Sequence, residues 1–358
     1  MTTSAYIHIP FCKSKCKYCS FVSFTNCQEI EQYVPALLKD IQVNYRGELL
    51  KTLYLGGGTP SLLSLNILGQ IVKSFSLDTN SEITIEVNPD DASLDYFKGL
   101  LDIGINRISM GSQSFDNNIL KIIGRRHTSE QTKKAVEFAQ SAGFKNVSLD
   151  LIYGLPEQNN IKTDLEMITQ LGVQHISTYG LKIEEGSYFY NHLPKNLPDD
   201  DRQADMYLEI NEYLAKKEFK RYEISNFAKV GYESQHNLNY WNNSEYYGFG
   251  LAAHGYVNGV RYSNLTNMAD YIEQPIKKDF EHKVTKKEKL EEEIFLGFRK
   301  ETGIDVREIN KKFNIDFEIL YKPVLTKFVP QYIEKTSKGY KLTLEGFLLS
   351  NNILSEFI

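Results

Sequence analysis

Residues 82–87 read EITIEV and residues 146–151 read NVSLDL, and both stretches alternate apolar and polar side chains. Successive side chains of a strand point to opposite faces of a sheet, so Glu86 and Asp150 point away from the apolar face, close to the carboxyl ends of their strands. Strands covered by helices on both faces would read as continuous apolar runs. The alternation favours a barrel-like sheet with a polar site in its mouth, where α/β barrels build active sites. Either carboxylate taken alone reads equally well as an ordinary strand-end residue.

Short apolar runs alternate with helical patterns along the first half of the chain. In the helical stretches apolar residues recur every three or four positions, as at Ile30, Val34, Leu37 and Ile41. Pro35 lies inside this pattern and would either begin the helix or kink it. The predicted strands are residues 5–9, 51–55, 82–87, 105–110, 146–151 and 175–180. Repeated strand–helix units imply parallel strands with right-handed crossovers, so we predict an α/β fold built on a partial (β/α)6 barrel.

The composition changes after residue 218. Eleven of the 44 residues in 219–262 are Phe, Tyr or Trp, interleaved with Asn and Gly. This texture favours strands and tight turns over helix, and it fits a pocket for a flat ligand as well as a plain aromatic core. We expect three domains: the barrel in 1–218, an aromatic-rich α+β extension in 219–284 and a small winged-helix-like domain in 285–358. The last carries 13 basic and 12 acidic residues, so we expect a structural or docking role for it.

Composition and charge exclude several classes of protein. The 358 residues are 41% hydrophobic and 24% charged, which is ordinary globular usage, and the net charge is -5. A generic nucleic-acid binder would carry a basic excess, so we expect no nucleic-acid partner. The chain shows no signal-peptide pattern and no apolar stretch approaching the length of a membrane span. We therefore expect a cytoplasmic protein.

Three of the four cysteines, Cys12, Cys16 and Cys19, follow the first predicted strand with the spacing C-x3-C-x2-C. A cubane iron–sulfur cluster held by three thiolates leaves one iron open to a small ligand, whereas structural zinc sites are closed by four ligands. A zinc site completed by His8 or a distant histidine remains an alternative. The lysines between the cysteines would lower the pKa of the thiols. Cys27 fits no cluster spacing and is expected to be passive.

Residues 56–60 read GGGTP at the end of the second predicted strand. Glycines at such a turn let a ligand approach the backbone and present N–H groups to a carboxylate. The motif alone is a weak signal, because glycine-rich turns between strand and helix are common. Its position at the same end of the predicted barrel as the cysteine loop gives it more weight.

Together these motifs resemble the radical S-adenosylmethionine (SAM) enzymes of the oxygen-independent coproporphyrinogen III dehydrogenase group. The matching motifs are the triple cysteine with Tyr18, GGGTP (56–60), IEVNP (85–89), GSQSF (111–115), GRRHT (124–128), DLIYGLP (150–156) and the C-terminal LTLEGFLLSNNILSEFI (342–358). The resemblance implies a [4Fe-4S] cluster, with SAM chelating the open iron through its methionine amino and carboxylate groups. It implies that Cys12, Cys16 and Cys19 bind the cluster. The implied SAM contacts are Tyr6, Gly57, Gly58, Thr59, Glu86, Gln113, Arg125 and Asp150.

Three features point to the haem chaperone branch of this group. The dehydrogenases carry a fourth cysteine two residues after the third, where this chain has Phe21. They also carry a long extension before the cluster, whereas the first cysteine here is residue 12. In addition, residues 236–241, HNLNYW, resemble the HNxxYW haem-binding motif of the chaperone branch. The resemblance thus implies a haem site that includes His236, although a lone histidine in an aromatic loop is also commonly structural.

The resemblance implies a chaperone that binds haem and transfers it to respiratory haem proteins, without coproporphyrinogen dehydrogenase activity. The alternative is the dehydrogenase itself, a radical SAM enzyme that decarboxylates porphyrinogen propionates. Either function is compatible with a flavodoxin- or ferredoxin-type electron donor. The chaperone function is also compatible with peripheral contact with a membrane.

Overall fold

The computed structural model describes residues 2–358, and its centre is a nine-stranded sheet in the order β7-β8-β6-β5-β4-β3-β2-β1-β9. Strands β1 to β6 pair in parallel with their neighbours. They are β1 (Ser4–Ile9), β2 (Leu50–Gly57), β3 (Leu77–Val87), β4 (Arg107–Gln113), β5 (Val147–Tyr153) and β6 (His175–Gly180). Each contains or overlaps one predicted strand. The prediction of a parallel α/β sheet is confirmed.

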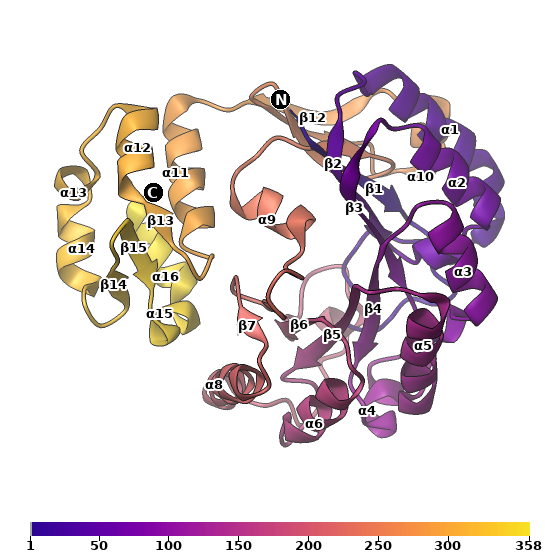
Figure 1. Ribbon diagram of the computed structural model, residues 1–358, viewed down its shortest axis with the longest axis horizontal. Coiled ribbons are helices and arrows are strands. Elements are labelled where there is room, and N and C mark those ends of the chain that lie inside the picture. Colours follow the sequence, from indigo (N-terminus) through magenta and orange to yellow (C-terminus); the bar gives the residue numbers. More distant parts are fainter. Residues whose placement is uncertain (1) are drawn as a thin grey trace.

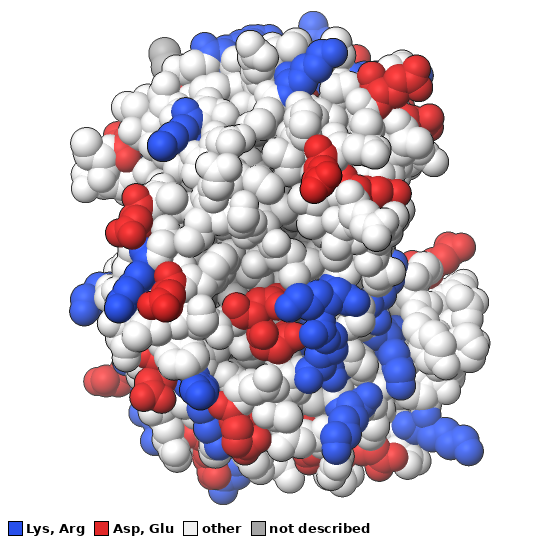
Figure 2. Space-filling model, turned by 90° about the vertical axis from the view of Figure 1, so that its right-hand side faces the viewer, with Lys and Arg blue, Asp and Glu red and all other residues white. Residues whose placement is uncertain are grey.

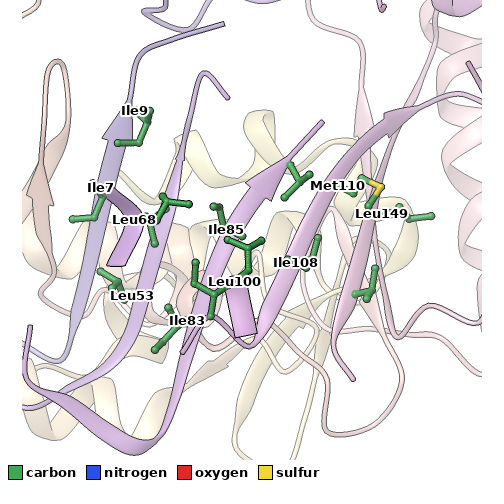
Figure 3. Close-up of a cluster of buried hydrophobic side chains, with 14 of the residues drawn as sticks. Ile7, Ile9, Leu53, Leu68, Ile83, Ile85, Leu100, Ile108, Met110 and Leu149 are labelled. Carbon is green, nitrogen blue, oxygen red and sulfur yellow. The ribbon is translucent and has the colours of Figure 1, made fainter. Parts of the chain in front are cut away.

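Helices cover one face of this sheet (Figure 1). The helices of the first half are α1 (Ile30–Asn44), α2 (Leu65–Lys73), α3 (Leu94–Asp102), α4 (Asn117–Ile122), α5 (Ser129–Ala142) and α6 (Lys162–Gln170), and Pro35 lies within α1. Figure 3 shows strand side chains such as Ile83 and Ile85 packed with Leu68 of α2 and Leu100 of α3. The apolar strand face is therefore the outer, helix-covered face, and the polar face looks into the barrel.

Residues from the aromatic-rich segment complete both edges of the sheet. At one edge β8 (Asn226–Ala228) pairs antiparallel with β6, and β7 (Lys220–Arg221) pairs with β8. At the other edge β9 (Tyr247–Phe249) pairs in parallel with β1. The remaining strands of this segment, β10 (His254–Val257), β11 (Val260–Asn264) and β12 (Lys278–Lys283), form a separate antiparallel sheet. The short helix α10 (Met268–Glu273) lies between β11 and β12 in the chain. The segment thus shares the sheet of the first 218 residues.

The HNLNYW motif lies on a helix, α9 (Gln235–Trp241), and here the expectation of strands and turns is wrong. The hydroxyl of Ser234 caps this helix by accepting a hydrogen bond from the Asn237 backbone N–H (3.3 Å). Two more N–H groups of its first turn, those of Gln235 and His236, donate to the Glu82 carboxylate of β3 at 3.0 Å each. Glu82 lies 152 positions before Ser234 in the chain. This tertiary contact thus supports a helix that local composition does not predict.

The C-terminal residues form a unit of helices and a β-hairpin with an apolar core of its own. Its elements are α11 (Lys286–Gly297), β13 (Ile304–Asp305), α12 (Val306–Phe313), α13 (Phe317–Leu320), α14 (Lys322–Phe328), β14 (Ile333–Lys335), β15 (Gly339–Leu342), α15 (Leu344–Leu348) and α16 (Ser350–Leu354). Its own apolar core also takes in Tyr207 of α8 (Asp200–Lys216). A salt bridge between Arg221 and Glu301 (2.5 Å) ties this domain to the sheet.

The outer face of the helical layer carries charges of both signs, with Lys and Arg side chains lying beside Asp and Glu side chains (Figure 2). None of the helices in residues 2–358 combines the length and the apolar character needed to cross a bilayer.

Candidate functional site

A cavity of about 570 Å³ opens at the carboxyl ends of the parallel strands and on the loop after β1. Among the residues that line it are Cys12, Cys16, Cys19, Gly57, Gly58, Thr59, Glu86, Gln113, Arg125 and Asp150. The structure thus brings together every predicted site residue except Tyr6 and His236. The strand alternation had placed Glu86 and Asp150 on one face, and both lie in this cavity.

The three cysteines of the loop after β1 are free thiols. The Cys12 N–H donates to the Phe24 carbonyl oxygen at 2.9 Å, which pins the loop to its own return segment. Within residues 2–358 no three Cys, His, Asp or Glu side chains converge closely enough to hold one metal ion. A cubane has no such requirement, because each thiolate binds a different iron. His8 is engaged by the Val22 carbonyl oxygen and the Tyr6 hydroxyl, at 3.0 Å each. A zinc site completed by His8 would have to break one of these two hydrogen bonds.

The thiols lie in a less polar environment than their lysine neighbours suggest. Burial raises the pKa of Cys12 and of Cys19, and Lys15 lowers the pKa of Cys19 only weakly. Lys13 forms an ion pair with Asp91 instead. Burial therefore outweighs the lysines, and the net pKa of these two thiols is raised rather than lowered.

The glycine turn is required by close packing of β2 against β1 and the cysteine loop. Gly57 has φ +110°, and a Cβ there would lie 2.5 Å from the His8 ring, while a Cβ on Gly58 would lie 2.6 Å from the Phe11 carbonyl oxygen. The Gly57 N–H donates to Glu86 Oε2 at 3.0 Å, and the Gly58 N–H donates to the Ile9 carbonyl oxygen at 2.8 Å. These N–H groups thus serve the protein's own acceptors, unlike the expectation that they face a ligand.

Two partly buried carboxylates share the wall of the cavity. Glu86 accepts from the Tyr54 hydroxyl at 2.9 Å as well as from Gly57, and burial raises its pKa to about 7, with the nearby Asp150 adding to the rise. Asp150 accepts from the Ser109 hydroxyl at 3.4 Å, and burial also raises its pKa. Both carboxylates can accept hydrogen bonds from a ligand amine or ribose, and Glu86 can take up a proton near neutral pH.

Arg125 joins the carboxyl ends of the strands to the cysteine loop. Its Nη2 donates to Asn88 Oδ1 at 2.7 Å and to the Gly111 carbonyl oxygen at 2.6 Å, and its Nη1 donates to Cys16 Sγ at 3.5 Å. Asn88 also donates through Nδ2 to the Thr59 hydroxyl at 3.0 Å. The buried Nε of Arg125 has no hydrogen-bond partner within residues 2–358, so this guanidinium is incompletely paired.

Tyr6 and His236 do not line the cavity, and both lie beside Tyr54. The Tyr6 ring stacks on Tyr54 with centroids 6.1 Å apart. His236 is 1% exposed, and its Nδ1 and Nε2 form hydrogen bonds with the hydroxyls of Thr52 and Tyr240, each at 2.8 Å. Burial lowers its pKa to about 3, so the ring is neutral. Iron ligation by His236 would break at least one of these bonds, and its role in haem binding, like that of Tyr6 in SAM binding, stays a prediction.

Sequence reasoning missed three residues of the site, Tyr54, Asn88 and Arg107. Arg107 is 2% exposed and lines the cavity, and its nearest ionic partner is Glu82 at 4.0 Å. A usable signal was present for each: Arg107 and Tyr54 lie on the polar face of their strands by the same alternation that located Glu86, and Asn88 belongs to the quoted IEVNP motif.

The donor set fits both implied cofactors. Three thiols on one loop suit a [4Fe-4S] cluster with an open iron. Next to them, two partly buried carboxylates and an incompletely paired guanidinium suit the ammonium, hydroxyl and carboxylate groups of SAM. Cys12, Cys16 and Cys19 would hold the cluster, and Glu86, Arg125 and Asp150 would contact SAM.

Comparison with known proteins agrees with this geometry. Residues 6–168 match the Radical SAM superfamily, and residues 284–349 match the HemN C-terminal domain. The fold and the three-cysteine loop thus define a radical SAM protein. The proteins called Heme chaperone HemW from Lactococcus lactis, Bacillus subtilis and Escherichia coli are 40%, 37% and 34% identical to it, each over 99% of this chain and at least 97% of its own length. The chain belongs to the HemW family.

One solved structure shares the whole fold. Coproporphyrinogen III oxidase (HemN) from Escherichia coli superposes with a TM-score of 0.87 over 99% of this chain and 90% of its own, at 22% sequence identity. This likeness establishes the architecture, including the small C-terminal domain, and at that identity it says nothing of a shared reaction.

Proposed function

We propose that this protein binds haem and hands it to haem proteins, with a SAM-coordinated [4Fe-4S] cluster supporting or controlling that role. The observation that carries the proposal is the full-length identity of 34 to 40% to proteins called Heme chaperone HemW, from three organisms. The oxidase with the same fold is more distant, at 22%.

Phe21 supports the chaperone over the dehydrogenase. Its ring is 67% exposed at the rim of the cavity, at the position where the dehydrogenases carry a fourth cysteine. An exposed phenylalanine cannot bind iron or supply a thiol. It offers an apolar surface to a flat partner instead.

The protein's own residues would prepare the cavity for its cofactors. When bound, the cluster supplies an open iron and one-electron chemistry at the mouth of the barrel. Asn88 holds Arg125 in place, and Tyr54 with Gly57 orients the Glu86 carboxylate. Partial burial of Glu86 and Asp150 lowers the local dielectric constant and strengthens hydrogen bonds to them.

The proposal also covers the location, the partners and the domain organisation of the protein. We place the protein in the cytoplasm, with respiratory haem proteins as acceptors, a flavodoxin- or ferredoxin-type protein as electron donor and peripheral contact with the membrane that holds the acceptors. We divide it into the barrel (1–218), the extension with the haem motif (219–284) and the C-terminal domain (285–358). Fractionation of cells and crosslinking to membrane-bound acceptors test the location and the partners.

One experiment separates the two functions. Cluster-loaded protein is incubated with coproporphyrinogen III, SAM and a reductant, and the product is assayed for protoporphyrinogen. In parallel, haem is titrated into the same sample without SAM. We expect about one haem per chain and no decarboxylation, since iron ligation needs no radical. Rapid conversion of coproporphyrinogen III would favour the dehydrogenase, and a cluster-loaded sample that binds no haem would contradict the chaperone.

A further inference from the structure

The loop after β6 carries an exposed histidine next to the cysteine loop. His192 follows the short helix α7 (Tyr188–Asn191), and its Nδ1 lies 3.2 Å from the Tyr188 carbonyl oxygen. A carbonyl oxygen only accepts, so in the neutral ring Nδ1 carries the proton and Nε2 carries the lone pair. No hydrogen bond joins Nε2 to any of residues 2–358. Metal-binding histidines commonly donate their other ring N–H to a backbone carbonyl in this way.

The surroundings of His192 suit a flat apolar ligand with acidic edges. Its ring stacks on that of Tyr188, with centroids 4.1 Å apart and planes 7° apart, which fixes its orientation. Tyr188, Tyr190 and Leu193 are 51%, 54% and 70% exposed, so apolar surface faces solvent around the imidazole. The Lys17 ammonium lies 5.9 Å from the centroid of the Tyr188 ring. A cation here could pair with a carboxylate of the ligand.

We propose that His192 is an axial ligand of the haem iron, with the porphyrin lying against Tyr190 and Leu193 and a propionate near Lys17. The inference rests on the proposed chaperone function and names the site where the cargo binds. It differs from the HNLNYW motif, whose histidine has both ring nitrogens engaged inside the barrel.

The other exposed histidines lack this arrangement. His282 of β12 forms an ion pair with Glu288 at 3.0 Å, which occupies its Nε2. His254 of β10 has no aromatic ring stacked on it within residues 2–358, and no carbonyl oxygen holds one of its ring nitrogens there. The ring of His282 stacks on Phe280, with centroids 6.2 Å apart, but its Nε2 is engaged by Glu288. Among the exposed imidazoles of residues 2–358, His192 alone combines a stacked ring with an Nε2 that has no hydrogen-bond partner.

The proposed site is physically continuous with the cysteine loop. The Phe189 N–H donates to the Lys17 carbonyl oxygen at 2.9 Å. Lys17 lies between Cys16 and Tyr18 in the sequence. Phe189 is buried in a small apolar cluster against which Tyr18 packs. Any change of the loop on cluster or SAM binding would therefore move α7 and His192 with it.

The test is a haem titration of the full-length, cluster-loaded protein, read by the haem absorption and electron paramagnetic resonance spectra. The variants are His192→Ala, His192→Gly with and without added imidazole, His236→Ala, and His254→Ala as the matched exposed histidine. We expect His192→Ala to lose the nitrogen-ligated spectrum and to bind haem at least about tenfold more weakly, because loss of a ligand exceeds the effect of losing a supporting group. Imidazole should restore the spectrum of His192→Gly. His254→Ala should behave as wild type.

The outcomes separate this inference from the chaperone proposal. If wild type and His192→Ala share one spectrum and one affinity while His236→Ala loses both, the His192 site is wrong and haem binding stands. Equal losses in His192→Ala and His254→Ala would mean unspecific binding to surface imidazoles, and would also overturn the site. A wild-type sample that binds no haem overturns both proposals. Circular dichroism and cluster content check that each variant is folded, which His192→Ala should be because its side chain is exposed.

Discussion

The imidazole ring of His236 lies nearly parallel to the phenol ring of Tyr54, with centroids 5.0 Å apart and planes 29° apart. Tyr54 lines the cofactor cavity and donates its hydroxyl hydrogen to Glu86. Only one side chain therefore separates the histidine of the HNLNYW motif from a proposed SAM contact. Because α9 is anchored inside the barrel, a ligand that displaced His236 would disturb the cavity wall as well.

The first prediction concerns this anchoring. Glu82→Ala removes the acceptor for the Ser234 hydroxyl and for two N–H groups of α9. It should lower the free energy of unfolding by about 2 to 4 kcal/mol, since buried donors and the Arg107 guanidinium lose their partner. Urea denaturation of the cluster-free protein measures this. Glu233→Ala, which loses only an acceptor for the Gly231 N–H, should change it by about 0.5 kcal/mol or less. Equal losses would show that Glu82 does not hold α9.

The second prediction concerns the cluster. Anaerobic reconstitution should give about four iron and four sulfide per chain. Replacement of Cys12, Cys16 or Cys19 by Ser should abolish cluster formation, because each thiolate is a covalent ligand. Cys27→Ser is the matched control and should keep the cluster. Iron and sulfide analysis with absorption spectra provides the measurement, and a cluster that depends on Cys27 but not on Cys12 would contradict the assignment.

The third prediction concerns SAM. Arg125→Ala and Asp150→Asn should each weaken SAM binding by about 1.5 to 3 kcal/mol, roughly ten- to hundredfold, the usual effect of losing a charge-assisted hydrogen bond. Isothermal calorimetry on cluster-loaded protein tests this, with Asp205→Asn on the exposed side of α8 as control. Asp150→Asn keeps the shape of the side chain, so its cluster content should be unchanged. Unaltered affinity in the double variant would refute this map of the site.

The fourth prediction concerns pH. Burial raises the pKa of Glu86 from its ordinary value of 4.5 to about 7, so the folded state binds this proton more tightly than the unfolded state. The resulting stability is complete below about pH 4.5 and is lost as the pH rises through 7. The unfolding free energy of Glu86→Gln minus that of wild type should therefore rise by about 2 to 3 kcal/mol between pH 5 and pH 8.

Using the difference between two pH values cancels the constant cost of the altered hydrogen bonds to Tyr54 and Gly57. Chemical denaturation of the cluster-free protein at both pH values gives the result. The exposed Glu345→Gln should show no such rise. A pH-independent difference for Glu86→Gln would mean that its carboxyl group is not protonated on burial in this range.

The sequence predicted the interior of the barrel better than its borders. Alternation in EITIEV and NVSLDL located Glu86 and Asp150 because one helix-covered face forces a strict inward and outward pattern. Gln113, a contact implied by the resemblance, also lines the cavity, where it has φ +65° beside an irregularity in the pairing of β4 with β5. Local alternation is a property of a few neighbouring residues, so it can be read without knowing the fold.

Features that depend on distant residues could not be predicted in this way. Helix α9 forms where composition favours strands, because Glu82 accepts its first N–H groups. The pKa of Cys12 and Cys19 follows burial, which the sequence neighbourhood of lysines does not reveal. The engagement of both His236 nitrogens by Thr52 and Tyr240 likewise needs coordinates, because Thr52 lies 184 positions away.

The placement of β9 beside β1 also bears on how the chain is made. Tyr247 pairs with Ala5, so the outer edge of the first strand has no partner until residue 247 has left the ribosome. An unpaired strand edge is a template for aggregation while synthesis continues. The barrel therefore cannot be finished as an N-terminal unit during translation. The cysteine loop that follows β1 leaves the ribosome early. Strand β1, which supports this loop, has neighbours on both sides only after most of the polypeptide has been made.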